Sequence, residues 1–221
     1  MNYSKVIDLS IPVTNDTPVF PGDPKPTIYS AASITDDGYN VSKLEIGSHT
    51  GTHVDSPYHI MENGHRMDET PLEQCMGKGF IINATEKKPG TGVTLNEVKD
   101  DIEKAGPGKI ALFYTGWSHY LGTEKYFNHP YITEEVVTAL LDKGVRTFFI
   151  DALNIDPPTG NSFACHEAIT AKNGIIGENF TNFDQLDVKD PFIIALPLKL
   201  AGLDGSPVRA VALIEPLTQS Q

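Results

Sequence analysis

The amino-acid sequence predicts an α/β fold built on a mixed sheet. Short apolar segments bounded by glycine or proline recur along the chain, which is typical of strands buried on both faces. Over the last two-thirds of the chain these segments alternate with helix signals, whereas residues 1–90 contain strand signals and no strong helix signal. This order favours a mixed sheet, or two stacked sheets with helices outside. Because the chain has 221 residues and a typical domain has roughly 150, we expect a single domain over residues 1–221.

Seven segments of the chain are predicted strands, because each is short and dominated by apolar residues. In chain order they are Val6–Ile11, Val41–Ile46, Phe80–Ala84, Ile110–Tyr114, Thr147–Ile150, Phe192–Leu196 and Val208–Ile214. The nearly continuous apolar runs among them indicate strands that are covered on both faces.

Two helices are predicted from their capping residues. Thr94 and Glu97 form a capping box at the start of the first helix, which ends at Gly106. Thr133 caps the second helix, and the glutamates of its first turn suit the positive end of the helix dipole. Gly144 is placed to end this helix in a left-handed conformation.

Composition and charge exclude several classes of protein. Apolar residues make up 39% and charged residues 21% of the chain, which excludes disordered and collagen-like proteins. The net charge of −12 is expected to repel phosphate backbones and anionic lipid, so we expect no nucleic-acid partner and no membrane partner. No segment approaches the roughly 18 apolar residues of a membrane helix. Since Met1–Leu9 also lacks an apolar signal segment, we expect a cytoplasmic protein.

Any metal is expected to be bound by histidines and carboxylates. The chain has only two cysteines, Cys75 and Cys165. They are too few for a disulfide framework or for a cysteine-based zinc module.

Four of the seven histidines, His49, His53, His59 and His65, fall within one short stretch. Its first part reads His49-Thr-Gly-Thr-His53-Val-Asp55-Ser-Pro-Tyr-His59. Neutral imidazole nitrogens and carboxylate oxygens are donors that Zn²⁺ and Mn²⁺ accept. Any one of these histidines alone is better explained as a solvated loop residue or a core residue bonded to the backbone. Together with Asp55 they indicate a metal site.

The spacing of His49 and His53 requires a bend between them. The intervening residues are poor helix formers, and in a straight strand the two histidines would lie about 13 Å apart. Gly51 permits a bend that brings the imidazoles together, and its missing side chain leaves room for a metal. Asp55, two residues after His53, then points to the same site.

His59 is expected to approach this site from another direction, because Pro57 interrupts strand pairing and redirects the chain. We interpret His59 as a residue that transfers protons and not as a metal ligand. Imidazole suits this role because it titrates close to neutral pH.

A second segment offers the donors that would complete the site. His166 lies near the start of a short helix predicted over Cys165–Asn173, and Glu178 follows the turn at Gly174. The helix and its return loop can therefore bring His166 and Glu178 together. Glu167 competes with Glu178, but on a helix it would point away from its neighbour His166. The alternatives are an ordinary histidine at a helix start and a surface carboxylate.

The two segments together resemble the cyclase family of metal-dependent hydrolases, whose best-known members are bacterial kynurenine formamidases and isatin hydrolases. The resemblance rests on the motif at 49–59 and on His166 followed by Glu178-Asn179. The segments Asp8-Leu-Ser, Pro18-Val-Phe-Pro21-Gly22-Asp23 and Thr115-Gly116-Trp117 also resemble the family, so matching motifs span nearly the full length.

The family resemblance implies a layered β/β/α domain (swivelling, cyclase-like) that forms a homodimer or a larger homo-oligomer. The aromatic segment Tyr114–Tyr131 is a candidate subunit contact. Cys165 lies outside the family pattern, and we interpret it as a packing residue; an effect on the choice of metal is the alternative.

By position, the resemblance implies a centre with one or two divalent ions. The implied ligands are His49, His53 and Asp55 for one ion, with His166 and Glu178 for the other. Asp55 or Glu178 would bridge the two. Zn²⁺ is the first choice for the metal and Mn²⁺ the second.

The resemblance also implies hydrolysis of an amide-type C–N bond in a small-molecule substrate, with His59 as the catalytic residue. The favoured activity is that of an arylformamidase, which converts N-formyl-L-kynurenine to L-kynurenine and formate. An isatin-type cyclic amide or a lactone is the alternative substrate. Since an aryl group needs an aromatic-lined pocket, we expect Phe20, Trp117 and Phe163 to form its walls.

The sequence leaves two functions of other classes open. A cysteine hydrolase would use Cys165, although the adjacent His166 cannot readily act as its base because neighbouring side chains point apart. A non-catalytic metal-binding protein would hold its ion in a closed coordination sphere, with no position for water.

Overall fold

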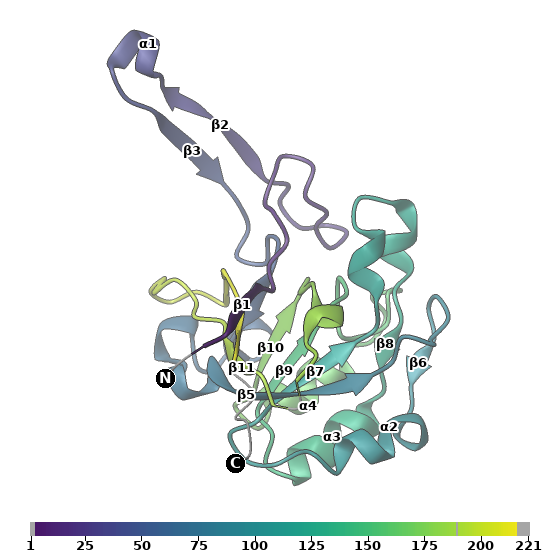
Figure 1. Ribbon diagram of the computed structural model, residues 1–221. Coiled ribbons are helices and arrows are strands. Elements are labelled where there is room, and N and C mark those ends of the chain that lie inside the picture. Colours follow the sequence, from purple (N-terminus) through teal and green to yellow (C-terminus); the bar gives the residue numbers. More distant parts are fainter. Residues whose placement is uncertain (1–2, 189, 216–221) are drawn as a thin grey trace.

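The structure, a computed structural model, describes residues 3–188 and 190–215, and its centre is one nine-stranded mixed sheet (Figure 1). The strands of this sheet, in spatial order, are β1 (Lys5–Asp8), β13 (Val211–Ile214), β11 (Phe192–Ile194), β5 (Met76–Asn83), β7 (Ile110–Tyr114), β9 (Thr147–Ile150), β10 (Ile175–Glu178), β4 (His53–Asp55) and β12 (Gly205–Pro207). Two separate pairs are formed by β2 (Thr27–Ala32) with β3 (Val41–Glu45), and by β6 (Gly92–Val93) with β8 (Tyr131–Ile132). The helices are α1 (Ile34–Asp37), α2 (Leu95–Ile102), α3 (Glu134–Asp142) and α4 (Ala164–Thr170).

The middle of the large sheet is parallel and both of its flanks are antiparallel. Strands β5, β7, β9 and β10 pair in parallel. Strands β4 and β12 on one side, and β11, β13 and β1 on the other, pair in the antiparallel sense. The mixed sheet that the sequence predicts is confirmed, and it is one continuous sheet.

Side chains of the central strands alternate between two hydrophobic cores, one on each face of the sheet. Helices α2, α3 and α4 lie over one face of the sheet (Figure 1). In β9, Phe148 and Ile150 join the core on this face, whereas Phe149 points to the opposite core. This opposite core also contains Ile7 of β1 and Ala212 of β13. The outer strands therefore curl over the face that the helices leave free, which agrees with layered β/β/α packing.

Local sequence signals locate the central elements correctly. Strands β7 and β9 have the bounds that the sequence predicts, and α2 and α3 follow their predicted caps. The Glu97 carboxylate accepts a hydrogen bond of 2.8 Å from the backbone N–H of Thr94, and Gly144 has φ +89° after α3. The sequence does not predict α1 or the strands β2, β4, β6, β8, β10 and β12. All of these strands except β2 have only two to four residues, too short for a periodic pattern.

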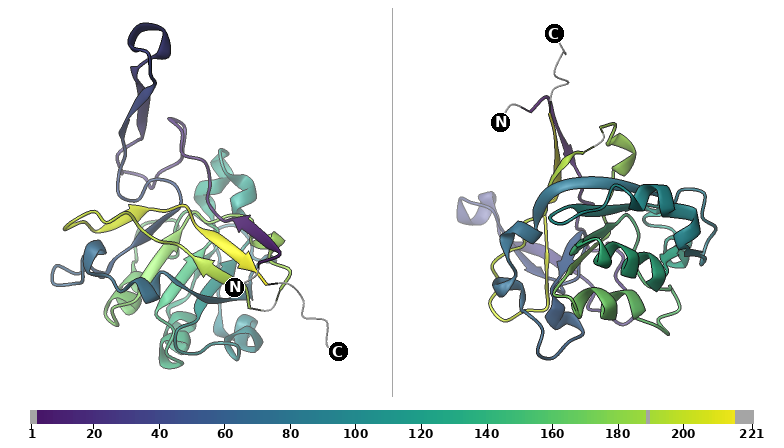
Figure 2. Two further views of the ribbon diagram at one scale, coloured as in Figure 1. Left: turned by 60° about the vertical axis from the view of Figure 1, so that its left-hand side comes forward. Right: turned by 90° about the horizontal axis from the view of Figure 1, so that it is seen from below.

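The hairpin of β2 and β3, with α1 at its tip, projects from the body of the molecule (Figures 1 and 2). We call residues 27–46 the arm. No residue of the arm is buried. Its large exposed apolar side chains are Tyr29, Ile34, Tyr39, Val41, Leu44 and Ile46.

The aromatic segment Tyr114–Tyr131 packs mainly against the core of its own chain. Trp117 and Tyr126 are buried, and Nε1 of Trp117 donates a hydrogen bond of 3.1 Å to the Tyr126 carbonyl. Phe127 is the large apolar side chain that this segment exposes. Throughout residues 3–188 and 190–215, no helix combines the length and apolar character needed to cross a membrane.

Candidate metal centre

The bend predicted between His49 and His53 is present. Gly51 has φ +68°, a left-handed conformation that favours glycine, and the centroids of the two imidazole rings lie 5.0 Å apart. The sequence predicts that the missing side chain of Gly51 leaves room for a metal. In the structure, a Cβ at this position would instead lie 2.8 Å from Cγ2 of Val13. The glycine therefore makes room for Val13 and not for a metal ion.

Strand pairing brings Glu178 to the histidine segment. Strand β4 lies between β10 and β12, and its residue His53 stands directly opposite Glu178 of β10. His166 enters from the first turn of α4. Glu167, the competing carboxylate, is exposed.

Two overlapping groups of donor atoms form where these elements meet. One group is His49, His53 and Asp55, and the other is Asp55, His166 and Glu178. Within each group, one donor atom per residue lies within 4.8 Å of the others. We call these five residues the donor cage. Asp55 is common to both groups, so its carboxylate lies between them.

Two of the three histidines of the cage, His53 and His166, are oriented at Nδ1 by partners outside it. Nδ1 of His53 lies 2.8 Å from the Gly51 carbonyl oxygen, and Nδ1 of His166 lies 2.7 Å from Oδ2 of Asp156. Both contacts suit an Nδ1–H donor, which leaves each Nε2 as the nitrogen that faces the carboxylates and could bind an ion. Metal-binding histidines are characteristically fixed in this way.

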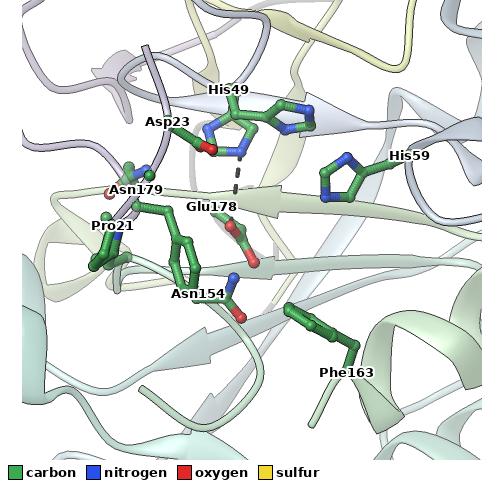
Figure 3. A pocket seen from close by; sticks show the side chains of 12 residues that line it. Pro21, Asp23, His49, His59, Asn154, Phe163, Glu178 and Asn179 are labelled. Carbon is green, nitrogen blue, oxygen red and sulfur yellow. Dashed lines mark ion pairs between the residues drawn. The ribbon is translucent and has the colours of Figure 1, made fainter. Parts of the chain in front are cut away.

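Distances from His53 and His166 to the carboxylates of the cage fit a cation better than a set of hydrogen bonds. Nε2 of His53 lies 3.3 Å from Oδ1 of Asp55 and 3.7 Å from Oε2 of Glu178, the ion pair drawn in Figure 3. Nε2 of His166 lies 3.6 Å from Oδ2 of Asp55. These separations exceed ordinary hydrogen-bond lengths. Donors at about 2.1 Å from a tetrahedral ion lie about 3.4 Å from one another, in the same range.

The second carboxylate oxygen of Asp55 also favours a bound cation at this site. Among the described residues, this buried Oδ2 has no hydrogen-bond partner. Burying an unsatisfied charged oxygen is costly, and a bound ion removes that cost. The site therefore suits a divalent metal as its cofactor.

The charges of the cage also favour a bound cation. Burial and the neighbouring Asp55 carboxylate raise the pKa of Glu178 to about 7. Burial lowers the pKa of His166, but its contacts with Asp156 and Asp55 outweigh this effect and raise the pKa to about 10. Two buried carboxylates repel each other, and a divalent cation between them offsets that repulsion.

His59 lies beside the cage, next to His49. The 3₁₀ turn Pro57–His59 follows β4 and brings the His59 ring to 4.1 Å from the His49 ring, measured between centroids. The centroid of the His166 ring lies 5.7 Å away. Burial lowers the pKa of His59, so its imidazole is neutral at pH 7 and has a lone pair that can accept a proton.

Asp204 also belongs to this region, although no motif in the sequence predicts it. Its Oδ2 lies 2.8 Å from Nε2 of His49 and 3.6 Å from Nδ1 of His59, and the three residues form a further donor group. The one local signal is the Asp-Gly pair that it forms with Gly205, which is typical of any turn. Its partners lie far away in the sequence.

A cavity of about 280 Å³ opens beside the cage, and Figure 3 shows side chains that line it. His59 and Glu178 are among the lining residues, and so are Phe20 and Phe163, two of the three aromatic walls expected from the sequence. Trp117, the third, lies elsewhere: it is 3% exposed within the core under the helices. The structure thus brings two of the three aromatic side chains to the cavity.

Cys165 points away from the cavity. Its thiol donates a hydrogen bond of 3.1 Å to the carbonyl of Ile132, and burial raises the pKa of the thiol. A protonated thiol within the core cannot attack a substrate in the cavity. A cysteine hydrolase therefore does not fit this structure.

Comparison with known proteins agrees with this geometry. The family described as "Putative cyclase" matches residues 7–157. The chain belongs to this cyclase family. A kynurenine formamidase from Bacillus thuringiensis subsp. konkukian (strain 97-27) is 33% identical over 221 residues, covering 98% of this chain and 100% of the relative.

Solved structures share the fold of this cyclase-family protein. An isatin hydrolase bound to the product analogue thioisatinate matches with a TM-score of 0.88 and 22% identity, covering 96% of this chain and 93% of the other. A potential metal-dependent hydrolase with cyclase activity matches with a TM-score of 0.79 and 26% identity, covering 96% and 98%. The cyclase-family protein is thus an enzyme, a hydrolase that uses a divalent metal.

Proposed function

We propose that this cyclase-family protein is an arylformamidase that hydrolyses N-formyl-L-kynurenine to L-kynurenine and formate. The observation that carries the proposal is the donor cage at the wall of a cavity that also presents Phe20 and Phe163. An aryl formamide needs both an activated water and an apolar surface for its ring. The likeness to a kynurenine formamidase over 98% of the chain supports this substrate.

We infer that the five residues of the donor cage bind the metal. If two ions bind, Asp55 would contribute to both sites, because it belongs to both donor groups. Zn²⁺ is the first choice and Mn²⁺ the second, since both accept a mixture of imidazole and carboxylate donors. When bound, the ion acidifies a water molecule and polarises the carbonyl of the substrate.

In the proposed reaction His59 moves the proton. It accepts a proton from water as the water oxygen forms a bond with the formyl carbon. When the C–N bond breaks, His59 returns this proton to the aryl nitrogen, which leaves as the amine. Formic acid is the second product, and it ionises to formate. Phe20 and Phe163 provide apolar surface for the aryl ring.

Hydrolysis of an isatin-type cyclic amide or of a lactone is the second candidate. The fold similarity to an isatin hydrolase favours it, because the two chains match over nearly their whole length. A non-catalytic metal-binding protein is less well supported, since His49, His53 and Glu178 line a cavity large enough for water and a small ligand.

Metal replacement with two substrates tests the proposal. We expect chelation to abolish hydrolysis and Zn²⁺ or Mn²⁺ to restore it, with a higher kcat/KM for N-formyl-L-kynurenine than for isatin. Both rates are followed by absorbance, and metal content is measured in parallel. A preference for isatin would establish the second candidate. Bound metal with no hydrolysis of either substrate would contradict both.

We also propose that the arm contacts a second copy of this chain. A two-stranded hairpin is only marginally stable alone, and the arm exposes six large apolar side chains. It spans residues 27–46, or 20 residues, and one side of a standard interface contains about 20–30. A two-fold dimer would cover both arms at once, which makes a homodimer the simplest assembly.

A single domain over residues 1–221 and a cytoplasmic location stay predictions.

Leu44→Asp should weaken this assembly, because it places a charge on an apolar surface of the arm. We expect the wild type to sediment as a dimer and the variant to shift toward the monomer. Leu72→Asp is the matched control, since Leu72 is 57% exposed outside the arm and Leu44 is 54% exposed. A monomeric wild type, or equal dissociation of both variants, would contradict the role of the arm.

A further inference from the structure

One carboxylate, that of Asp204, contacts two histidines that have different proposed roles. Oδ2 of Asp204 lies 2.8 Å from Nε2 of His49 and 3.6 Å from Nδ1 of His59. The two imidazole rings lie 4.1 Å apart between centroids. The carboxylate thus borders both the donor cage and the residue that we infer moves the proton.

The backbone of Asp204 is attached to the strand that carries the cage. The backbone N–H and the hydroxyl of Ser56 donate hydrogen bonds of 2.9 Å and 3.0 Å to the Asp204 carbonyl. The next residue, Gly205, pairs with Asp55 across β12 and β4. The position of Asp204 relative to Asp55 is therefore set by strand pairing and not by a free loop.

Gly205 allows the His49 ring to lie against the backbone. A Cβ on Gly205 would lie 2.9 Å from Cε1 and 3.3 Å from Nδ1 of His49, so a larger residue would displace the ring. On either side of this contact, Nδ1 of His49 lies 2.6 Å from Oδ1 of Asp55, and Nε2 faces Asp204. The ring is held by steric contact on one face and by carboxylates at both nitrogens.

We propose that Asp204 is a positioning residue, which accepts the Nε2–H of His49 and faces the Nδ1–H of His59. This rests on the proposed function. Accepting from Nε2 of His49 leaves Nδ1 as the nitrogen directed at the cage, where a bound ion would replace the proton that Nδ1 shares with Asp55. Facing Nδ1 of His59 leaves the Nε2 of that ring as the nitrogen that exchanges the proton. A carboxylate behind a metal-binding imidazole fixes the tautomer of the ring and increases its affinity for the ion.

A direct ligand role for Asp204 is the competing explanation, since His49, His59 and Asp204 also form a compact donor group. The two roles predict different metal stoichiometries. A positioning residue changes the affinity for the ion but not the number of ions bound at saturation. A ligand of a separate ion changes that number by one per chain.

Asp204→Asn tests the proposal, with Zn²⁺ as the probe. We expect a 10–100-fold weaker affinity for Zn²⁺ in competition with a chelator, an order of magnitude typical of such outer carboxylates, and an unchanged number of ions at saturation. With saturating Zn²⁺, kcat should fall while KM changes little, because His59 loses its orientation. Asp204→Glu should recover part of the affinity.

Asp68→Asn is the matched control. Oδ1 of Asp68 accepts a hydrogen bond of 2.9 Å from the backbone N–H of Gly202, so it supports the same loop without contacting either imidazole. Gly205→Ala should also weaken Zn²⁺ binding by displacing His49. Gly106→Ala should not, because a Cβ on Gly106 has open space around it.

Wild-type affinity and kcat in Asp204→Asn would overturn the proposal, and so would an equal loss in Asp68→Asn. The loss of one bound ion per chain would instead establish a ligand role. The Zn²⁺ titration needs no substrate, so it decides the role of Asp204 at His49 even if the wild type hydrolyses neither N-formyl-L-kynurenine nor isatin.

Discussion

Replacing His59 with alanine is expected to lower kcat by about 10²–10⁴-fold, the usual contribution of general acid–base catalysis. The imidazole lines the cavity beside the donor cage, and its ring lies 4.1 Å from that of His49, between centroids. It does not belong to either donor group that contains Asp55. The variant should therefore keep its metal while it loses the group that carries a proton from water to the leaving nitrogen.

Steady-state kinetics and metal content, measured on the same preparation, test this expectation. His65→Ala is the matched control, because His65 belongs to the same stretch of sequence and is exposed. The control should retain both activity and metal. If His59→Ala loses its metal together with its activity, His59 is a ligand and the proton must be moved by another group.

Replacing Asp55 with asparagine is expected to abolish metal binding and, as a result, turnover. Asp55 is the only residue present in both donor groups of the cage, and it is 1% exposed. A carboxamide offers one neutral oxygen in place of two anionic ones, and its NH₂ group would face a histidine nitrogen. We expect the affinity for Zn²⁺ to fall by more than about 100-fold, beyond the range seen for outer-sphere partners.

Metal analysis after dialysis and a Zn²⁺ titration measure this effect. Asp151→Asn is the control for removing a buried carboxylate. Asp151 is fully buried, but its oxygens accept hydrogen bonds from Thr115 and Gly116 and not from the cage. The Asp151→Asn variant should have a lower free energy of unfolding but should bind metal as the wild type does. Normal Zn²⁺ affinity in Asp55→Asn would contradict the assignment of the cage.

Much of the fold could be predicted because its signals are local. The caps at Thr94 and Thr133 and the apolar runs of β7 and β9 act within a few residues, so the sequence indicates them directly. Strands β4 and β12 have three residues each and exist because β10 and β4 offer them partners. Pairing between distant segments decides such strands, and no periodicity within them predicts it.

The site likewise combines residues that local sequence signals predict with residues that only long-range contacts bring together. His49, His53 and Asp55 lie within seven consecutive residues, and Gly51 signals the bend that gathers them. Asp204 could not be predicted, because it meets His49 across 155 positions of sequence. The sequence predicts Trp117 at the cavity, but an aromatic side chain is just as suited to the core, where Trp117 lies. The two locations cannot be distinguished by residue type alone.

The pairing of β4 with β10 has a consequence for the biogenesis of the enzyme. His53 meets Glu178, and Asp55 meets Gly205, only after most of the chain has been synthesised. A nascent polypeptide that ends before Glu178 lacks one of the five residues of the donor cage and the strand that pairs with His53. Ion loading should thus follow folding rather than guide it, and the captured ion then stabilises only the finished protein.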